Sequence, residues 1–167
     1  EHYRLLSCLS TLFNNSNLFD IGTHYGHSAF ALSYNDTNRI QTFDIVNDVT
    51  NAKIKNRHNI NFNICDLFVE KGMKMWSPVL LDSPLIFLDV DPHNGIMEKN
   101  FYDYLYDHKY QGVLLCDDIH YFEGMKNNFW SKIPDEYKTD LTSYGHWSGT
   151  GIISFNKAHQ DIVTYLS

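Results

Sequence analysis

Five short apolar runs recur along the first 116 residues, and more polar segments separate them. The runs at 85–88 and 113–116 are apolar at every position, so both faces of the elements they form must be covered. Such runs are typical of strands in a parallel sheet that has helices on both sides. The predicted strands are residues 18–21, 40–43, 60–64, 85–88 and 113–116.

The segments between these runs favour helices. At the start of the chain, residues 1–15 place Leu5, Leu6, Leu9 and Leu12 on one stripe at helical spacing, which predicts an amphipathic N-terminal helix. The other predicted helices are residues 26–33, 51–56, 95–108 and 123–133. Strands that alternate with helices indicate βαβ units.

The pattern changes near the end of the chain. Residues 137–142 and 150–155 look like two strands joined by a turn that contains glycine, without an intervening helix. The predicted fold class is therefore α/β: a Rossmann-like three-layer sandwich whose mostly parallel seven-stranded sheet ends in a C-terminal antiparallel hairpin. Because no repeat or linker interrupts it, the chain is expected to be one domain, 1–167, with the helix of 1–15 before a core of 17–156.

Composition narrows the function classes. The 167 residues are 43% hydrophobic and carry a net charge of −7, which suits one domain with a buried core. An acidic surface repels polyanions, so a nucleic-acid partner is not expected. No stretch is long and apolar enough to span a bilayer, and the three cysteines lack metal-type spacing. We therefore expect a cytoplasmic protein with no membrane partner.

A glycine-containing loop follows the first predicted strand, in the segment FDIGTHYGHSAFALS. Glycine tolerates positive φ and lets a ligand approach the backbone, and the spacing D-x-G-x-x-x-G resembles motif I of class I methyltransferases. A purely structural strand–turn–helix would need similar glycines. The candidate cofactor-binding residues here are Asp20, Gly22, Thr23, His24, Gly26 and Ser28.

Acidic residues also end the second and third predicted strands. Asp44 stands about 20 residues beyond the glycines, where a carboxylate can accept both ribose hydroxyls of a nucleoside cofactor. Asp66 is a candidate for the adenine amino group, although aspartate at such a place is also a favoured helix cap.

Carboxylates gather after the fourth and fifth predicted strands. Asp89 and Asp91 end LIFLDVDPHNG, and Asp117 and Asp118 end GVLLCDDIH. If these strands are neighbours, their carboxyl ends meet in one cleft, where like charges repel unless a cation is present. Oxygen ligands of this kind suit Mg²⁺, Mn²⁺ or Ca²⁺ rather than zinc.

With these segments in view, the chain resembles the cation-dependent O-methyltransferases, the group of the catechol and caffeoyl-CoA enzymes. GTHYGHSAFALS is similar to their G-x-x-x-G-x-S-A helix entry, FLDVDPHN to their F-x-D-x-D-x-x-N segment and GVLLCDDI to their G-G-x-x-x-x-D-N pair. The resemblance implies S-adenosyl-L-methionine as cofactor and a divalent cation, Mg²⁺ first, held by Asp89, Asp117 and Asp118. Asp118 stands where the family usually has asparagine.

One departure concerns the general base. The family often has lysine after the D-x-D segment, and here Pro92 takes that place. His93 and His120 are the nearest titratable groups and are the candidate bases, with Asp89 as the third candidate catalytic residue. Each imidazole can instead be a surface or supporting group. Sugar and antibiotic O-methyltransferases, which pair a similar D-x-D segment with a nearby histidine, are an equally good match.

The expected activity is methyl transfer to a hydroxyl of a small molecule. A cation that chelates adjacent oxygens favours a sugar, a glycan or a catechol-like diol as the acceptor, and a homodimer stays open. His146 and Trp147, in a predicted turn, are candidate acceptor contacts or ordinary turn residues.

Three rivals remain at this point. A non-catalytic cofactor-binding or interaction domain that has lost its base is the main alternative, because of Pro92. A nucleic-acid methyltransferase would want an N/D-P-P-Y-type segment and a basic face, which the chain lacks. A nicotinamide dehydrogenase is disfavoured by the glycine spacing.

Overall fold

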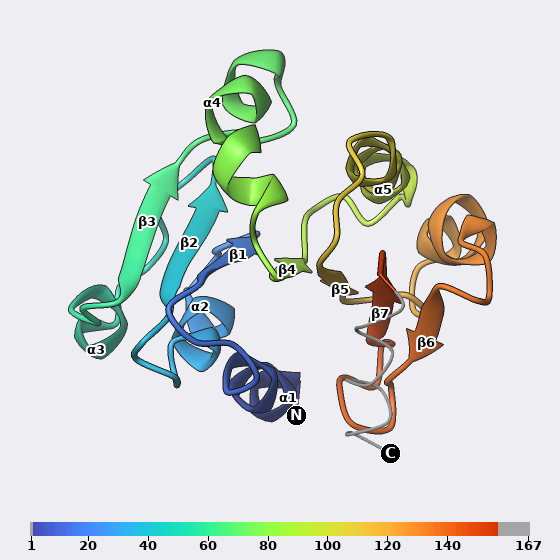
Figure 1. The fold of residues 1–167 in the computed structure, drawn as a ribbon. Helices are drawn as coiled ribbons and strands as arrows, with labels where there is room; N and C mark the ends of the chain where they lie inside the picture. The colour runs from blue at the N-terminus through green and yellow to red at the C-terminus, as the bar shows by residue number, and fades with distance from the viewer. Residues whose placement is uncertain (1, 157–167) are drawn as a thin grey trace.

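A seven-stranded sheet organises the computed structural model, which describes residues 2–156 (Figure 1). The strand order is β3-β2-β1-β4-β5-β7-β6, in which β1 to β5 run parallel and β7 is antiparallel to both of its neighbours. The strands are β1 (Asn17–Ile21), β2 (Arg39–Asp44), β3 (Ile60–Ile64), β4 (Leu85–Leu88), β5 (Val113–Cys116), β6 (Lys138–Asp140) and β7 (Gly151–Ser154). This arrangement confirms the predicted fold class, including the antiparallel hairpin.

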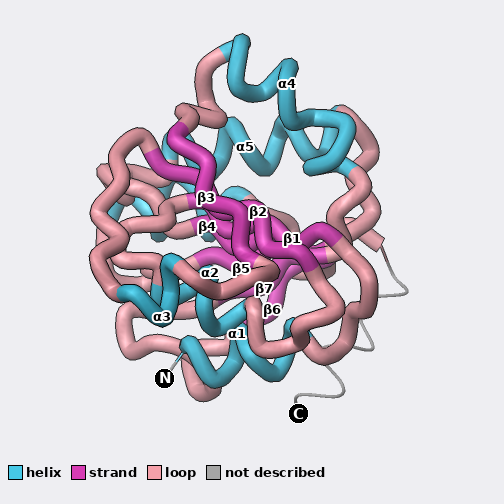
Figure 2. The backbone as a smooth tube through the Cα atoms, turned by 90° about the vertical axis from the view of Figure 1, so that its left-hand side faces the viewer, coloured by secondary structure: helices cyan, strands magenta, loops and turns pink. Residues whose placement is uncertain are grey.

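Helices cover both faces of this sheet. In Figure 2, α4 and α5 lie above the strands, and α1, α2 and α3 lie below them. The helical elements are α1 (His2–Ser10), α2 (His27–Leu32), α3 (Ala52–Lys55), α4 (Glu70–Leu81), α5 (Ile96–Asp107), the π-helix η1 (Met125–Phe129) and the 3₁₀ turn η2 (Trp130–Lys132). The sandwich therefore has three layers, as the apolar runs predicted.

Alternate residues of the central strands feed two separate cores. Phe19 and Ile21 of β1 join the core under α4 and α5, whereas Leu18 packs with α1 and α2 on the opposite face. Burial of both faces explains why β4 and β5 are apolar at every position, since side chains alternate along a strand.

Two helical segments differ from the sequence-based expectation. No helix was predicted for α4, because Gly72 and Pro78 lie inside it and both weaken the helical signal. The predicted helix 123–133 is instead η1 followed by η2. In the N-terminal segment 1–15, α1 itself ends at Ser10 and a turn follows at residues 11–12.

The domain prediction, 1–167, extends over residues 157–167, which lie outside the described part of the chain. Among residues 2–156, the helices are all too short or too polar to cross a lipid bilayer. Parallel β1, β2, β3, β4 and β5 end at one rim of the sheet. All the predicted site residues except Ser28 lie at these strand ends or in the loops that follow them.

Candidate functional site

The loop after β1 is pressed against the end of β4. Gly22 has φ +104°, and a Cβ at this position would stand 1.7 Å from the carbonyl oxygen of Asp89. The backbone N–H groups of Gly22 and Thr23 both donate to the carbonyl of Phe43, at 2.9 and 3.1 Å. Only glycine fits here, because any side chain would clash with the Asp89 backbone and because a positive φ is unfavourable for other residues. The loop and the acidic strand end therefore share one rim.

A chain of buried hydroxyls anchors this loop from below. Thr23 Oγ1 lies 2.6 Å from Thr42 Oγ1, and the Thr42 hydroxyl donates to Asp20 Oδ2 at 2.5 Å. Burial raises the pKa of the Asp20 carboxyl to about 7, against the lowering effect of hydrogen bonds from Thr42 and Ser28. Asp20, Thr23 and Ser28 are all buried, so they support the loop from within. Thr42 was missed, and its only signal is a polar residue in an apolar run.

Asp44 ties the loops after β1 and β2 together. Its Oδ2 accepts a hydrogen bond from the backbone N–H of His24 at 2.8 Å, and its Oδ1 accepts from Ile45 and Val46 at 2.7 and 3.3 Å. An ionised carboxylate has about four lone-pair sites, so these three bonds leave room for one more donor. Asp66 is exposed, and its Oδ1 accepts from the N–H of Phe68 at 2.8 Å. Asp66 therefore makes a local turn contact and does not cap α4, whose N-cap is Val69.

Three groups meet at the ends of β4 and β5. Asp89, His93 and Asp118 each offer a ligand atom within 4.8 Å of the others. His93 Nε2 lies 3.6 Å from Asp118 Oδ2 and 3.4 Å from Oδ1 of the exposed Asp91. The His93 ring stacks on Phe122, with centroids 4.8 Å apart and planes at 7°, so the imidazole is held against an apolar surface.

Negative charge accumulates at this group. The pKa of Asp89 is raised to about 8, first by burial and then by the neighbouring carboxylates of Asp117, Asp118, Asp20 and Asp91. A carboxyl group at such a pKa holds its proton at neutral pH unless a cation or a donor arrives. The structure thus brings Asp89 and Asp118 together with His93.

Asp117 faces a different set of side chains. Its Oδ2 lies 3.4 Å from His2 Nδ1 and 3.8 Å from His146 Nδ1, while Thr150 Oγ1 donates to its Oδ1 at 3.3 Å. Burial, followed by the charge of Asp118, raises the pKa of Asp117. Burial lowers the pKa of His2 to about 4, and His146 adds to this effect. His2 was not among the predicted site residues, because it lies at the far end of the sequence in a helix read only for its apolar stripe.

His120 is engaged elsewhere. Its Nε2 lies 2.6 Å from Asp140 Oδ2, at the end of the edge strand β6. Burial acts to raise the pKa of Asp140, but hydrogen bonds from Thr142 and His120 outweigh it, so the pKa of this carboxyl is lowered. Of the two candidate bases, His93 is therefore the one that lies with Asp89 and Asp118 at the ends of β4 and β5.

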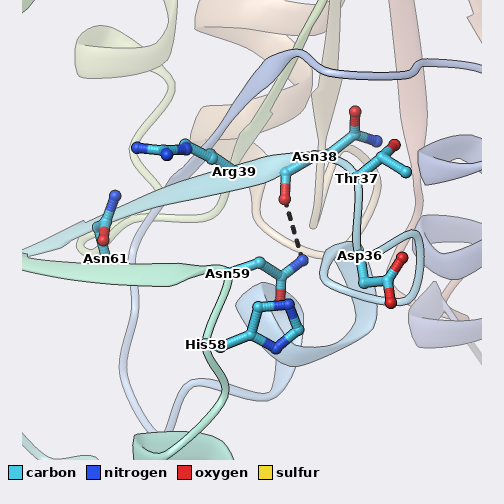
Figure 3. Close-up of a pocket in the computed structure, with 7 residues that line it drawn as sticks. All are labelled: Asp36, Thr37, Asn38, Arg39, His58, Asn59 and Asn61. Carbon is cyan, nitrogen blue, oxygen red and sulfur yellow. Dashed lines mark hydrogen bonds between the residues drawn. The ribbon is translucent and has the colours of Figure 1, made fainter.

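A polar cavity of about 360 Å³ lies away from this rim (Figure 3). It occupies the amino ends of β2 and β3, where Asn59 Nδ2 donates to the carbonyl of Asn38 at 3.0 Å. The lining residues are Asp36, Thr37, Asn38, Arg39, His58, Asn59 and Asn61. Because it lies at the opposite ends of these strands, this cavity does not contribute to the candidate site.

Comparison with known proteins gives a fold assignment. No protein-family model and no curated protein matches the sequence. Among solved structures, a putative caffeoyl-CoA O-methyltransferase from Staphylococcus aureus has 16% identity and a TM-score of 0.57 over 91% of this chain and 82% of its own. An O-methyltransferase from Bacillus cereus, in complex with SAH, has 15% identity and a TM-score of 0.60 over 90% and 78%.

A third match has a different acceptor class. An RNA methyltransferase from Salinibacter ruber, in complex with S-adenosyl-L-homocysteine, has 15% identity and a TM-score of 0.58 over 93% of this chain and 90% of its own. At such identities the likeness concerns the fold. The chain therefore has the fold of the class I S-adenosylmethionine-dependent methyltransferases and resembles the O-methyltransferases among them.

Proposed function

We propose that this protein transfers a methyl group from S-adenosyl-L-methionine to a hydroxyl of a small molecule or sugar, with the help of a divalent cation. The observation that carries the proposal is the contact between Gly22 and the Asp89 carbonyl. This contact places the loop of Gly22, which is the proposed cofactor loop, at the same rim of the sheet as Asp89, His93 and Asp118, which are potential metal ligands. Cation-assisted methyl transfer to oxygen needs these two parts side by side.

Two features of the chain support cofactor binding at this loop. Gly22 has positive φ and no side chain, so the loop can pass against the backbone of Asp89 and bring its own backbone to the rim where β4 ends. The remaining lone-pair capacity of Asp44 suits a ribose hydroxyl at the end of the next strand. S-adenosyl-L-methionine supplies the methyl group on a sulfonium, which is a good leaving group. His24 and Gly26 belong to the same loop, and both have positive φ.

The acidic group supports a divalent cation. Asp89 and Asp118 provide oxygen ligands beside His93, and the pKa of Asp89 is raised first by burial and then by neighbouring negative charge that a cation would neutralise. Asp117, which the family resemblance also assigns to this ion, directs its carboxylate toward His2 and His146 instead. A bound Mg²⁺ would lower the pKa of an acceptor hydroxyl. Asp89 and Asp118 are therefore its proposed protein ligands.

His93 is the proposed general base. Its ring is fixed by Phe122, and its Nε2 lies between the carboxylates of Asp91 and Asp118. A proton taken from the acceptor hydroxyl would rest on this nitrogen, where the two carboxylates stabilise the resulting imidazolium. The resembled family often has a lysine where this chain has Pro92, and proline cannot act as a base. His93 is the next residue after Pro92.

The acceptor is proposed to be a small hydroxylated compound such as a sugar, a glycan or a catechol-like diol. The net charge of −7 and the carboxylates at the rim oppose the phosphate backbone of RNA. The alternative is a non-catalytic domain that binds S-adenosyl-L-methionine, which the absence of the family's lysine favours.

A methyl-transfer assay tests the proposal. The 167-residue chain would be incubated with labelled S-adenosyl-L-methionine and Mg²⁺, with catechols, sugars and a structured RNA as acceptors. Transfer to a diol that stops with a chelator and in Asp89→Asn would support it. Cofactor binding without transfer to any acceptor would favour the non-catalytic alternative, and transfer to the RNA alone would contradict the acceptor class.

A further inference from the structure

A second group of ligand atoms lies beside the end of β5. It joins His2 of α1, Asp117 after β5 and His146 in the connection between β6 and β7. Asp117 Oδ2 is 3.4 Å from His2 Nδ1 and 3.8 Å from His146 Nδ1, and the three ligand atoms all lie within 4.8 Å of one another. Segments that are far apart in the sequence thus direct three donor atoms at one point.

The ring nitrogen of His2 gives independent evidence for a ligand. His2 is about nine-tenths buried, and its Nδ1 has no hydrogen-bond partner among the described residues. A buried polar atom without a partner costs free energy, so native structures rarely keep one that has no task. Asp117 Oδ2 lies 3.4 Å from this nitrogen, so the nitrogen points into the group.

The separations suit a metal ion better than direct hydrogen bonds. Zinc binds imidazole nitrogen at about 2.0–2.1 Å, so two ligands of one tetrahedral ion stand about 3.4 Å apart. The distance from Asp117 Oδ2 to His2 Nδ1 has this value, and the distance to His146 Nδ1 is somewhat longer. A small rotation of the His146 ring would bring the third ligand into place.

We infer that His2, Asp117 and His146 form a site for a divalent transition-metal ion, separate from the group of Asp89, His93 and Asp118. Two imidazoles and one carboxylate select ions such as Zn²⁺ or Co²⁺, whereas Mg²⁺ prefers oxygen ligands. This inference goes beyond the proposed methyl transfer and does not depend on it.

The surroundings of the group fit this role. Thr150 donates to Asp117 Oδ1, which leaves Oδ2 turned toward the two rings. Metal-binding carboxylates are commonly oriented by such a hydrogen bond. Ser148 Oγ lies 2.6 Å from His146 Nδ1, and a bound ion would replace Ser148 as the partner of this nitrogen. The ion would link α1 to β5 and to the hairpin, which are separate parts of the fold.

Cobalt binding tests the inference without any activity assay. The tag-free 167-residue chain, freed of metal with a chelator, would be titrated with Co²⁺, whose visible absorption becomes intense at a four-coordinate site. One equivalent should bind with such a spectrum, and excess Mg²⁺ should not displace it. His146→Ala and Asp117→Asn should each weaken this binding by more than about 100-fold, beyond the effect of losing a supporting residue.

Matched variants separate this site from the neighbouring one. His108→Ala removes the exposed histidine that follows the last residue of α5 and belongs to neither group, and Asp89→Asn removes a ligand of the other group. Both should keep the cobalt spectrum. His2→Ala gives a second test if His146→Ala does not fold, as judged by circular dichroism. Absence of cobalt uptake, uptake unchanged in the folded His146→Ala or His2→Ala variant, or equal loss in Asp89→Asn would overturn the inference.

Discussion

The backbone carbonyl of Asp89 lies directly against Gly22, so close that a Cβ on the glycine would stand 1.7 Å from its oxygen. The contact joins the end of β4 to the loop after β1, two strands that are neighbours in the sheet. The contact therefore links Gly22, where only glycine fits, to Asp89, whose carboxyl group has a raised pKa. A change at Gly22 should therefore affect the ligand loop and the acidic group together.

Replacing Gly22 should weaken cofactor binding. In Gly22→Ala, the new methyl group meets the Asp89 carbonyl and the residue keeps φ +104°, a strain of about 1–3 kcal/mol before the clash is counted. The loop must shift, and we expect S-adenosyl-L-methionine to bind more than tenfold more weakly by calorimetry. Asn15→Ala is the control, because Asn15 also has positive φ, at +55°, but lies away from the loop. Equal affinities in Gly22→Ala and wild type would contradict the assignment of this loop.

Stability of the metal-free protein should fall as the pH rises from about 6.5 to 8. The pKa of Asp89 is raised to about 8, far above its value of about 3.9 in an unfolded chain, so the folded state binds more protons in this window. Each such group contributes a slope of up to about 1.4 kcal/mol per pH unit. Below about pH 6.5 the lowered pKa of His2 offsets part of this decline, because it makes stability rise with pH there.

Urea unfolding in the presence of a chelator measures this slope. Asp20, with its pKa raised to about 7, contributes at the lower end of the window and stays the same in all variants. Asp89→Asn should give a shallower decline and higher stability than wild type at pH 8. A wild-type slope that Asp89→Asn leaves unchanged would show that another group is responsible.

Magnesium should stabilise the folded protein through Asp89 and Asp118. An ion that binds only the folded state raises the free energy of unfolding by about 2.7 kcal/mol at a concentration of 100 times its dissociation constant. Thermal unfolding at pH 7.5, with and without Mg²⁺, should show this shift in wild type and not in Asp118→Asn. His120→Ala is the control, because His120 is bound to Asp140. A shift of equal size in Asp118→Asn would place the ion elsewhere.

The two candidate bases should differ in their effect on the reaction. His93→Ala removes an imidazole that lies with Asp89 and Asp118, and the methyl-transfer rate should fall by about 10²- to 10⁴-fold, as for loss of a general base. His120→Ala removes an imidazole that contacts Asp140 instead of the proposed metal ligands, and the methyl-transfer rate should change less than tenfold. The measurement is the single-turnover rate with saturating cofactor. The opposite order would assign the base to His120.

The strands could be predicted because their signal is local. Consecutive apolar residues such as those of β4 and β5 indicate burial on both faces, and the predicted bounds agree with the structure. Helix α4 could not be predicted in this way, because its internal Gly72 and Pro78 oppose the helical signal and tertiary packing overrides them. The hairpin of β6 and β7 followed from two strand-like segments with no helix between them.

The candidate site could be predicted only in part. Strand ends indicated which acids share a rim, but not where each carboxylate points. Asp117 and Asp118 are adjacent in sequence, yet Asp118 meets His93 and Asp117 meets His2. The cause is local backbone geometry, since Asp118 has φ +61° and turns the chain at that point. The partner of Asp117 comes from the first helix, which no local pattern connects to β5.

A crystal structure of the protein soaked with S-adenosyl-L-homocysteine and Mg²⁺ tests the central claim most directly. We predict that the thioether lies over the loop of Gly22, with its sulfur facing the rim where Asp89, His93 and Asp118 meet and with an ion between the two carboxylates. Cofactor density at any other surface, with the Gly22 loop left empty at saturating ligand, would contradict this account.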